Sequence, residues 1–339
     1  SVLQFFLSDP LLIAIVRFVL GMLIGADYTV GIPLLSEWAP AKKRAGILGW
    51  LLVFWTIGYC ISYIVGFFMD GFVAAFGNDG WRLVLCTSVV PSLIALVIRF
   101  GTPESPLWHI AKGRPQEALA NIHAYLGNQY GLPDRGEEKP ASTSWFALFA
   151  PEQWRNTVVS GVFFFAQVLP FFAISIFLPL VLTKMNIQNP NASGVLYNVF
   201  TLIGVLVGLW IYGIATRRAY LLWTFYVSAA ILTVMILWTS MSPLVALIMI
   251  TAFALVLAAS IVPEFSYPAE LFPTELRGSG VGLTIAISRF GAGGGTFLLP
   301  IVSEQFGIHM ALWCCVITLL FGGIICHMWA PETSGRGKK

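Results

Sequence analysis

Nine long apolar runs constrain the fold of this chain more than any other feature. They cover residues 11–36, 45–68, 83–102, 156–182, 193–215, 220–240, 243–267, 278–302 and 308–330. Each run has about 20 residues or more, enough for a helix to cross a hydrocarbon core of roughly 30 Å. Inside lipid the backbone finds no water, so helices are the form that such runs can take. Charged residues are only 10% of the chain, against about 25% in soluble domains. We therefore predict an all-α membrane protein.

Charged residues and prolines repeat along the chain. The spacing E-x-x-P-x-x-x-R occurs twice, as Glu37, Pro40, Arg44 and as Glu270, Pro273, Arg277. A second motif follows two of the apolar runs, at Pro103-Glu104-Ser105-Pro106 and at Pro331-Glu332-Thr333-Ser334. This pattern predicts two copies of one unit, and parallel repeats of this kind are typical of secondary transporters.

The positions of Lys and Arg predict the orientation in the membrane. If the linker 38–44 is cytoplasmic and the spans alternate from there, nearly all basic residues fall on the inside. The inside set is Lys42, Lys43, Arg44, Lys112, Arg114, Arg135, Lys139, Arg155, Arg217, Arg218, Arg277, Arg336, Lys338 and Lys339, and the outside set is Arg82 and Lys184. The C-terminus is therefore expected in the cytoplasm. The net charge of +3 reflects topology and implies no nucleic-acid partner.

The long polar loop divides the chain unevenly, with three spans before it and six after it. We interpret the segments as the remainder of an N-terminal half (1–102), a cytoplasmic linker with an amphipathic helix (103–155), a six-helix C-terminal half (156–330) and a cytoplasmic tail (331–339). Within the linker, Pro115 is placed to start a second helix. If the two halves are copies, the first lacks three spans, so we expect an N-terminally truncated chain.

Four groups of residues carry a resemblance to a known family. Arg17, Gly21, Gly25, Glu37, Pro40 and Arg44 resemble its fourth-span signature R…G…G…E-x-x-P-x-x-x-R. Pro103-Glu104-Ser105-Pro106 with Gly113, Arg114 and Glu117 resembles its sixth-span exit PESPRW…GR…EA. Glu270, Pro273, Arg277 and Gly278, and then Pro331-Glu332-Thr333 with Gly335, resemble its E-x-x-P-x-x-x-R-G and its terminal PET-x-G.

In this order the motifs make the chain similar to the major facilitator superfamily, in its sugar-porter-like and organic-ion (metabolite:proton symporter) branches. The resemblance covers essentially the whole chain. It implies a helical bundle of two pseudo-repeated halves in which about nine of twelve transmembrane helices, numbers 4 to 12, are present. Similar proteins include bacterial inner-membrane metabolite transporters, which implies a bacterial inner membrane as the location.

The run expected to be helix 7 departs from the sugar-porter pattern QQ…G-x-N…YY. Aligned on Pro179, Gln167 keeps the first Gln, whereas the other positions hold Val168, Phe171, Ala173, Phe177 and Leu178. Phe265 replaces the usual Trp of helix 10 and follows Glu264. A site that leaves the hydroxyls of a hexose unpaired binds it poorly, so these residues favour a flatter, partly apolar substrate. Gln167, Phe171, Glu264 and Phe265 are candidate substrate-binding residues.

Four ionisable residues stand out inside the runs, because a charge there costs about 2.5–3.5 kcal/mol on insertion scales. They are Arg17, Asp27, Glu264 and Arg289. Arg289 is mid-span and precedes Gly291 and Gly295, whose spacing allows close helix approach. We interpret Arg289 as a cation that binds a substrate carboxylate; a structural ion pair is the alternative.

Arg17 and Asp27 are candidates for proton coupling. The resemblance implies that Arg17 pairs with an acid on the first helix of proton-coupled relatives, and a static bridge is the alternative. Asp27 is interpreted as a proton carrier, or else as a carboxylate bonded to neighbouring helices. Glu264 is assigned to coupling or to substrate contact.

The repeated motifs predict a latch at the cytoplasmic ends of the helices. Glu37, Arg44 and Glu104 would serve one half, and Glu270, Arg277 and Glu332 the other. The resemblance implies that such clusters hold the inner helix ends together when the cavity faces outward. The alternative is that these charges only anchor helix ends at the headgroups.

These features favour a secondary transporter that carries a small organic metabolite, in particular a carboxylate or aromatic acid, by proton symport. Alternatives are a sugar or organic-cation porter, a facilitator or exporter of the same fold, and a transporter-like sensor. The sequence has no G-x-x-x-x-G-K-[ST] and no catalytic cluster among its His, Cys and Glu, so we expect neither an enzyme nor a cofactor or metal. The expected partners are the substrate, protons and the lipid bilayer, for a protein acting as a monomer.

Overall fold

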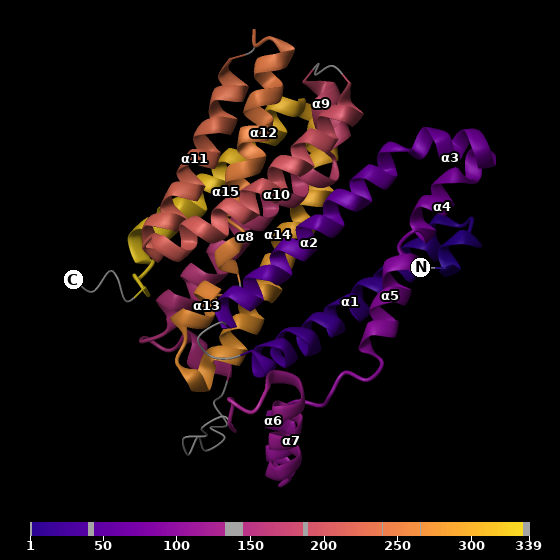
Figure 1. The fold of residues 1–339 in the computed structure, drawn as a ribbon. Coiled ribbons are helices and arrows are strands. Elements are labelled where there is room, and N and C mark those ends of the chain that lie inside the picture. Colours follow the sequence, from indigo (N-terminus) through magenta and orange to yellow (C-terminus); the bar gives the residue numbers. More distant parts are fainter. Residues whose placement is uncertain are drawn as a thin grey trace. The chain divides into compact units, whose positions relative to one another are not determined.

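The computed structural model describes residues 2–39, 44–132, 145–185, 189–238, 240–264 and 266–334. Throughout these ranges the regular structure is helical and no strand occurs (Figure 1). The predicted all-α class is confirmed. The chain forms two compact units, one of Ser1–Trp50 and Ile64–Lys139 and one of Leu51–Tyr63 and Pro140–Lys339.

The first unit contains α1, both ends of α2, and the helices up to α7. The bounds are η1 Val2–Phe5, α1 Pro10–Trp38, α2 Arg44–Phe67, α3 Met69–Phe76, η2 Gly77–Asp79, α4 Gly80–Cys86, α5 Val89–Arg99, α6 Pro106–Ala111 and α7 Pro115–Leu126. Asp9 caps α1, because its carboxylate accepts a hydrogen bond from the N–H of Leu11 at 2.8 Å. Pro115 begins α7 as predicted, and α6 and α7 lie side by side (Figure 1).

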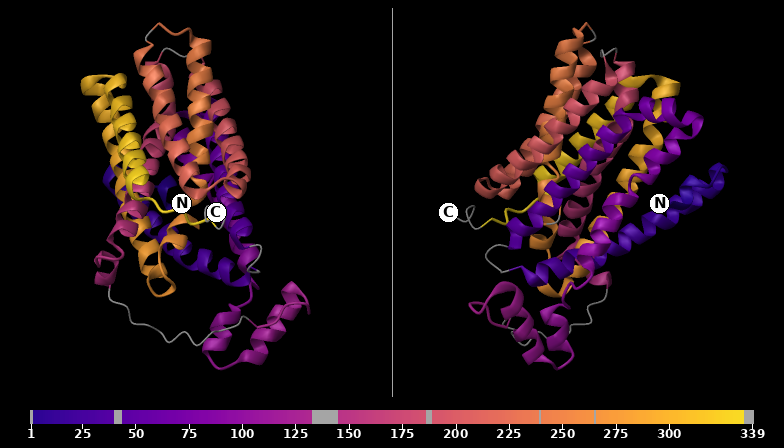
Figure 2. Two further views of the ribbon diagram at one scale, coloured as in Figure 1. Left: turned by 90° about the vertical axis from the view of Figure 1, so that its left-hand side faces the viewer. Right: turned by 45° about the vertical axis from the view of Figure 1, so that its right-hand side comes forward.

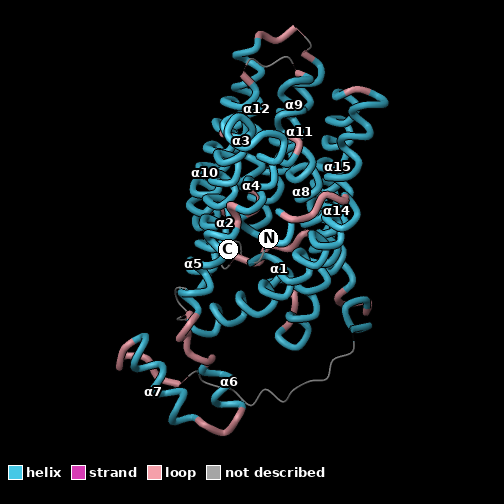
Figure 3. Tube along the Cα trace, turned by 90° about the vertical axis from the view of Figure 1, so that its right-hand side faces the viewer, coloured by secondary structure: helices cyan, strands magenta, loops and turns pink. Residues whose placement is uncertain are grey.

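The second unit is a helical bundle that includes the middle of α2. Its elements are η3 Trp145–Phe149, α8 Trp154–Ile176, α9 Leu178–Lys184, α10 Pro190–Ile214, α11 Arg217–Leu237, α12 Pro243–Ala259, η4 Val262–Glu264, α13 Ser266–Leu271, α14 Thr274–Phe306 and α15 Ile308–Trp329. α8 packs against α14 and α15, α10 against α12, and α11 against α15. Figure 2 shows α15, in yellow, along one side of this bundle. Short loops join most of its helices (Figure 3).

α8 is the centre of the second unit. Its apolar segment is 72% buried, more than any other candidate membrane span of the described residues. Phe163, Phe164 and Ile174 of this helix have no exposed surface. Gly291 and Gly295 let α14 approach α8 closely, because a Cβ at these positions would lie 2.8 Å from the Phe165 carbonyl oxygen and 2.5 Å from that of Leu169. The predicted close approach at this glycine pair is confirmed.

Nine stretches of the described residues are long and apolar enough to cross a membrane, as predicted. They are Pro10–Asp27, Gly46–Phe67, Gly80–Arg99, Trp154–Ile176, Ala192–Ile214, Arg217–Leu237, Pro243–Leu271, Leu276–Phe306 and Ile308–Trp329. The run 83–102 is not one uninterrupted helix, since it breaks between α4 and α5. The hydroxyls of Thr87 and Ser88 donate to the carbonyls of Val84 and Leu85 at 2.6 and 2.9 Å, bonds that compete with helix continuation.

Two further predicted runs are also interrupted. The run 156–182 divides into α8 and α9 at Phe177, where Pro179 lies in the first turn of the new helix. The run 243–267 ends as α12 at Ala259 and continues through the short η4. Pro263 lies inside η4, and a proline cannot donate the next helical hydrogen bond. These breaks place Phe177 in a turn and Glu264 at the end of the short η4 rather than inside long helices.

Candidate functional site

The buried side of α8 carries an amide without a partner. The Gln167 side chain is fully buried, and neither its oxygen nor its nitrogen has a hydrogen-bond partner among the described residues. An unpaired buried polar group of this kind costs about 1–3 kcal/mol. Pro170 follows within one turn and lacks the N–H that would bond to the Ala166 carbonyl. Gln167, predicted as a substrate ligand, is thus a polar group able to bind one.

Phe171 lies one turn beyond Gln167 in an aromatic cluster. Its ring centroid is 5.8 Å from that of Trp55 and 6.2 Å from that of Tyr59, both on the part of α2 that belongs to the second unit. The rings are tilted relative to one another, and their centroid distances lie in the range of about 4.5–7 Å that is usual for aromatic pairs. The predicted residues Gln167 and Phe171 therefore share one region of α8. Sequence reasoning missed Trp55 and Tyr59, although their i, i+4 spacing on an apolar helix was a signal of a common face.

α14 places Arg289 near Glu264. Glu264 ends η4 and is 8% exposed, whereas Arg289 is exposed. The charge of Arg289 acts on the Glu264 carboxyl, yet the described residues provide no ion pair within 4 Å for either group. The two predicted residues thus influence each other electrostatically without a direct bridge. Phe265 lies outside the described residues.

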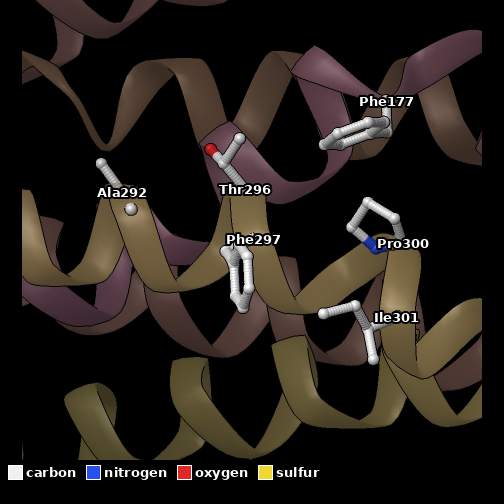
Figure 4. A pocket seen from close by; sticks show the side chains of 7 residues that line it. Phe177, Ala292, Thr296, Phe297, Pro300 and Ile301 are labelled. Carbon is white, nitrogen blue, oxygen red and sulfur yellow. The ribbon is translucent and has the colours of Figure 1, made fainter. Parts of the chain in front are cut away.

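An open apolar pocket lies between the end of α8 and the second half of α14. It has a volume of about 560 Å³, and its lining residues are Phe177, Ala292, Gly293, Thr296, Phe297, Pro300 and Ile301. Figure 4 shows the ring of Phe177 beside Pro300, with Thr296 and Phe297 one turn earlier on α14. The Thr296 hydroxyl is the one polar side-chain group of this lining. The volume lies in the range of about 300–1,000 Å³ that is usual for small-molecule sites.

In the first unit, Asp27 forms an ion pair with Arg99. Asp27 belongs to α1 and Arg99 to the last turn of α5, and both side chains are more than half exposed. Arg17 is also exposed, and no ion pair involves it within the described part of the chain. Sequence reasoning missed Arg99, which occupies the end of an apolar run where a basic residue is common.

The repeated motifs make the same contact in each unit. In the first unit the Ser105 hydroxyl donates to the carboxylate of Glu37, and in the second the Thr333 hydroxyl donates to that of Glu270. Each donor is the third residue of a Pro-Glu-Ser or Pro-Glu-Thr motif, and each acceptor is the Glu of E-x-x-P-x-x-x-R. The sequence repeat is therefore also a repeat of hydrogen bonding. The hydroxyls were not among the predicted site residues.

The remaining predicted latch residues do not share this contact. Glu104 is exposed, and the side chain of Arg44 lies outside the description. Arg277 donates through Nε to the Ala269 carbonyl at 2.9 Å. The cation beside Glu270 is Arg217, whose Nε is 3.5 Å from the Glu270 carboxylate.

Glu332 joins the end of α15 to the beginning of α11. Its carboxylate accepts hydrogen bonds from the backbone N–H groups of Arg217 and Arg218, at 2.9 and 3.0 Å, and a negative charge is favourable at a helix N-terminus. Partial burial opposes ionisation. Even so, hydrogen bonds from Ser334 and from these N–H groups lower the pKa of Glu332 below its ordinary value. Glu270, Glu332 and Arg217 thus form one network at this end of the second unit.

Comparison with known proteins gives a consistent result. The sequence model of the family described as "Sugar (and other) transporter" matches residues 1–338. The chain is 35% identical over 335 residues to the inner membrane metabolite transport protein YgcS of Escherichia coli, covering 98% of this chain and 74% of YgcS. It is 28% identical over 338 residues to the putative metabolite transport protein YaaU of Escherichia coli, covering 99% of this chain and 74% of YaaU.

Among solved structures, the chain is similar to the xylose transporter XylE from E. coli in a partially occluded inward open conformation. The TM-score is 0.76 at 18% sequence identity, and the match covers 95% of this chain and 72% of XylE. At this identity the likeness concerns the fold.

Proposed function

The chain belongs to the sugar (and other) transporter family of the major facilitator superfamily, and on this premise we propose that it carries a small organic anion by proton symport. It is a multi-pass membrane protein and a metabolite or sugar transporter of the major facilitator type. Its proposed location is the bacterial inner membrane, which the name of YgcS supports. A cytoplasmic C-terminus accords with the distribution of Lys and Arg.

Arg289 is the observation that supports an anionic substrate. It is an exposed cation in a membrane-spanning helix, and it has no ion pair among the described residues. A cation there costs about 2.5–3.5 kcal/mol unless it is used. A carboxylate bound in bidentate fashion would offset that cost.

α8 gives the reason to prefer such a substrate over a hexose. Gln167 is the buried amide of this helix, and the neighbouring positions are largely Phe. A sugar would leave most of its hydroxyls without partners against such a surface. We therefore assign Gln167 to the polar end of the substrate, with Phe171, Glu264 and Phe265 at the same site.

Proton symport requires a group that gains a proton as the anion binds. Glu264 is suited to this role, because it is buried within the electrostatic influence of Arg289. A protonated Glu264 would leave the whole charge of Arg289 to the substrate. In the first unit we assign coupling to Asp27 and Arg17, and a proton on Asp27 would release Arg99 from their ion pair.

The test is uptake of labelled carboxylates into membrane vesicles under an inwardly directed proton gradient. We predict that Arg289→Lys lowers kcat/KM at least tenfold, because Lys keeps the charge and loses the planar fork. Arg155→Lys is the matched control: Arg155 is exposed at the start of α8, where its guanidinium lies over the Trp154 ring. An unchanged kcat/KM for the transported acid in Arg289→Lys would contradict the anion assignment, and uptake insensitive to the gradient would contradict symport.

A further inference from the structure

The pocket on α14 and the cation Arg289 lie on one helix face. Arg289, Gly293, Thr296 and Pro300 follow one another at spacings of four, three and four residues, which keeps them on one side of an α-helix. With a rise of 1.5 Å per residue, about 10 Å of helix axis separates Arg289 from Thr296. The face thus presents a cation first and an apolar hollow one to two turns later.

Two glycines of α14 pack against α8, and a third lines the pocket. Gly291 and Gly295 face α8, where an added Cβ would meet backbone atoms of that helix. Gly293 lines the pocket, and a Cβ there would meet no atom of the described residues within 4 Å. The missing side chain at Gly293 therefore leaves space on the pocket side of α14 without any packing requirement for a glycine.

The chemistry of this face fits an amphiphilic anion. Apart from the Thr296 hydroxyl the pocket is lined by apolar groups, including the rings of Phe177 and Phe297 (Figure 4). A simple alkyl chain would contact the apolar surface alone and would leave the charge of Arg289 without a partner. A carboxylate attached through a short linker to an apolar ring would use both the charge and the hollow.

We propose that this pocket is the subsite for the apolar part of the transported anion, and that the substrate is a monocarboxylate bearing a ring. The carboxylate binds Arg289, and the ring occupies the space between Phe177, Gly293 and Thr296. This proposal rests on the proposed function and adds to it the position and the chemical class of the apolar group. It makes Gly293 a specificity-determining position, because a side chain there occupies the space of the ring.

The test compares 3-phenylpropanoate with propanoate as probes. Binding to the purified protein in lipid nanodiscs is measured by calorimetry, with 3-phenylpropylamine as the cationic counterpart. We expect 3-phenylpropanoate to bind at least about tenfold more tightly than propanoate, since one methylene in a fitting apolar pocket already changes binding by about 10–200-fold.

Two variants with the same chemical change locate the effect. Gly293→Leu fills the pocket, whereas Gly294→Leu adds the same side chain next to it, at a residue that also meets open space and does not line the pocket. We expect the advantage of the phenyl group to vanish in Gly293→Leu and to persist in Gly294→Leu, with propanoate binding similar in both. Ile301→Trp fills the pocket from another lining position and replaces Gly293→Leu if that variant does not fold.

The outcomes separate this proposal from the proposed function. Equal affinity for both acids, or a phenyl advantage that survives Gly293→Leu and Ile301→Trp, overturns the pocket subsite and leaves anion transport standing. Absence of 3-phenylpropanoate binding also overturns the subsite. Binding of 3-phenylpropylamine in place of both acids overturns the subsite and the anion assignment together. Lipid acyl chains that copurify with the wild type and are absent from Gly293→Leu, without any effect on 3-phenylpropanoate, identify a lipid groove instead.

Discussion

Arg217 shows how a single residue connects several parts of the second unit. Its guanidinium lies 3.8 Å from the centre of the Tyr212 ring and donates to the Tyr212 carbonyl at 2.6 Å. Its Nε is 3.5 Å from the Glu270 carboxylate, an ion-pair distance and too long for a good hydrogen bond. The planar group suits both stacking and carboxylate contact. Arg217 therefore serves as the cation of the Glu270–Glu332 network, a role that the sequence suggested for Arg277.

The lowered pKa of Glu332 predicts how its contribution to stability depends on pH. Burial raises the pKa of Glu332, but hydrogen bonds from Ser334, Arg218 and Arg217 together lower it by more. The net pKa therefore lies below the ordinary value of 4.5. A carboxyl with a depressed pKa in the folded state contributes stability above its unfolded pKa and loses it as the pH falls through the folded pKa.

We therefore expect the difference in Tm between wild type and Glu332→Gln to be constant above pH about 5. The difference should shrink as the pH falls below the unfolded pKa of about 4.5. Thermal unfolding of the two purified proteins between pH 3 and 7 measures it. A difference that grows on acidification would contradict the ionised cap.

At the scale of elements, the close packing of α14 on α8 depends on the glycines that face α8. Gly295→Ala would place a Cβ 2.5 Å from the Leu169 carbonyl oxygen, whereas the Cβ of Gly294→Ala would meet no atom within 4 Å in the described part of the chain. We predict that Gly295→Ala lowers stability by about 1–3 kcal/mol, the usual cost of overpacking. Gly294→Ala should be neutral or stabilising by up to about 1 kcal/mol, because alanine favours helix. Thermal unfolding compares the two variants, and equal Tm values would show that the contact with α8 is unimportant.

The elements also show what the sequence can predict. Nine spans could be identified because hydrophobic length alone determines which segments can cross a bilayer. The breaks at Thr87–Ser88 and Pro263 could not, since local hydroxyl bonds and single prolines leave the apolar character of a run unchanged. The ends of the uninterrupted helices lie within a few residues of the predicted ones, whereas α8 and α12 end before the predicted runs do.

The candidate site was predictable to a different extent. Gln167, Glu264 and Arg289 could be singled out because polar groups are rare in apolar runs. Their partners could not, because Trp55 and Arg217 come from helices that are distant in sequence, and only the fold brings them near α8 and Glu270. Arg99 was missed because a basic residue at the end of a span is ordinary, so its ion pair with Asp27 had no local signal.

At the scale of the whole molecule, the Glu–hydroxyl contact appears once in each unit. Glu37 accepts from Ser105 in the first unit and Glu270 accepts from Thr333 in the second. Each bond ties a helix end to the segment that follows the last span of that half. Equivalent contacts of this kind are expected where two halves of a transporter perform equivalent movements.

We predict that Ser105→Ala and Thr333→Ala each lower the uptake rate several-fold, while Ser105→Thr and Thr333→Ser retain it. Loss of a typical hydrogen bond costs about 0.5–1.5 kcal/mol, enough to shift a balanced conformational equilibrium several-fold. Uptake of the transported acid by membrane vesicles, normalised to the amount of protein, measures the effect. Full activity in one alanine variant with complete loss in the other would show that the two contacts are unequal.

The position of Glu332 also matters for protein engineering. Because its carboxylate caps the first turn of α11, the segment from Pro331 to Ser334 is a structural part of the second unit. A fluorescent fusion or affinity tag joined after Ser334 leaves this cap in place. A deletion that begins at Pro331 removes the cap together with the Thr333 hydroxyl. A reporter attached there would therefore report on a protein that lacks these hydrogen bonds.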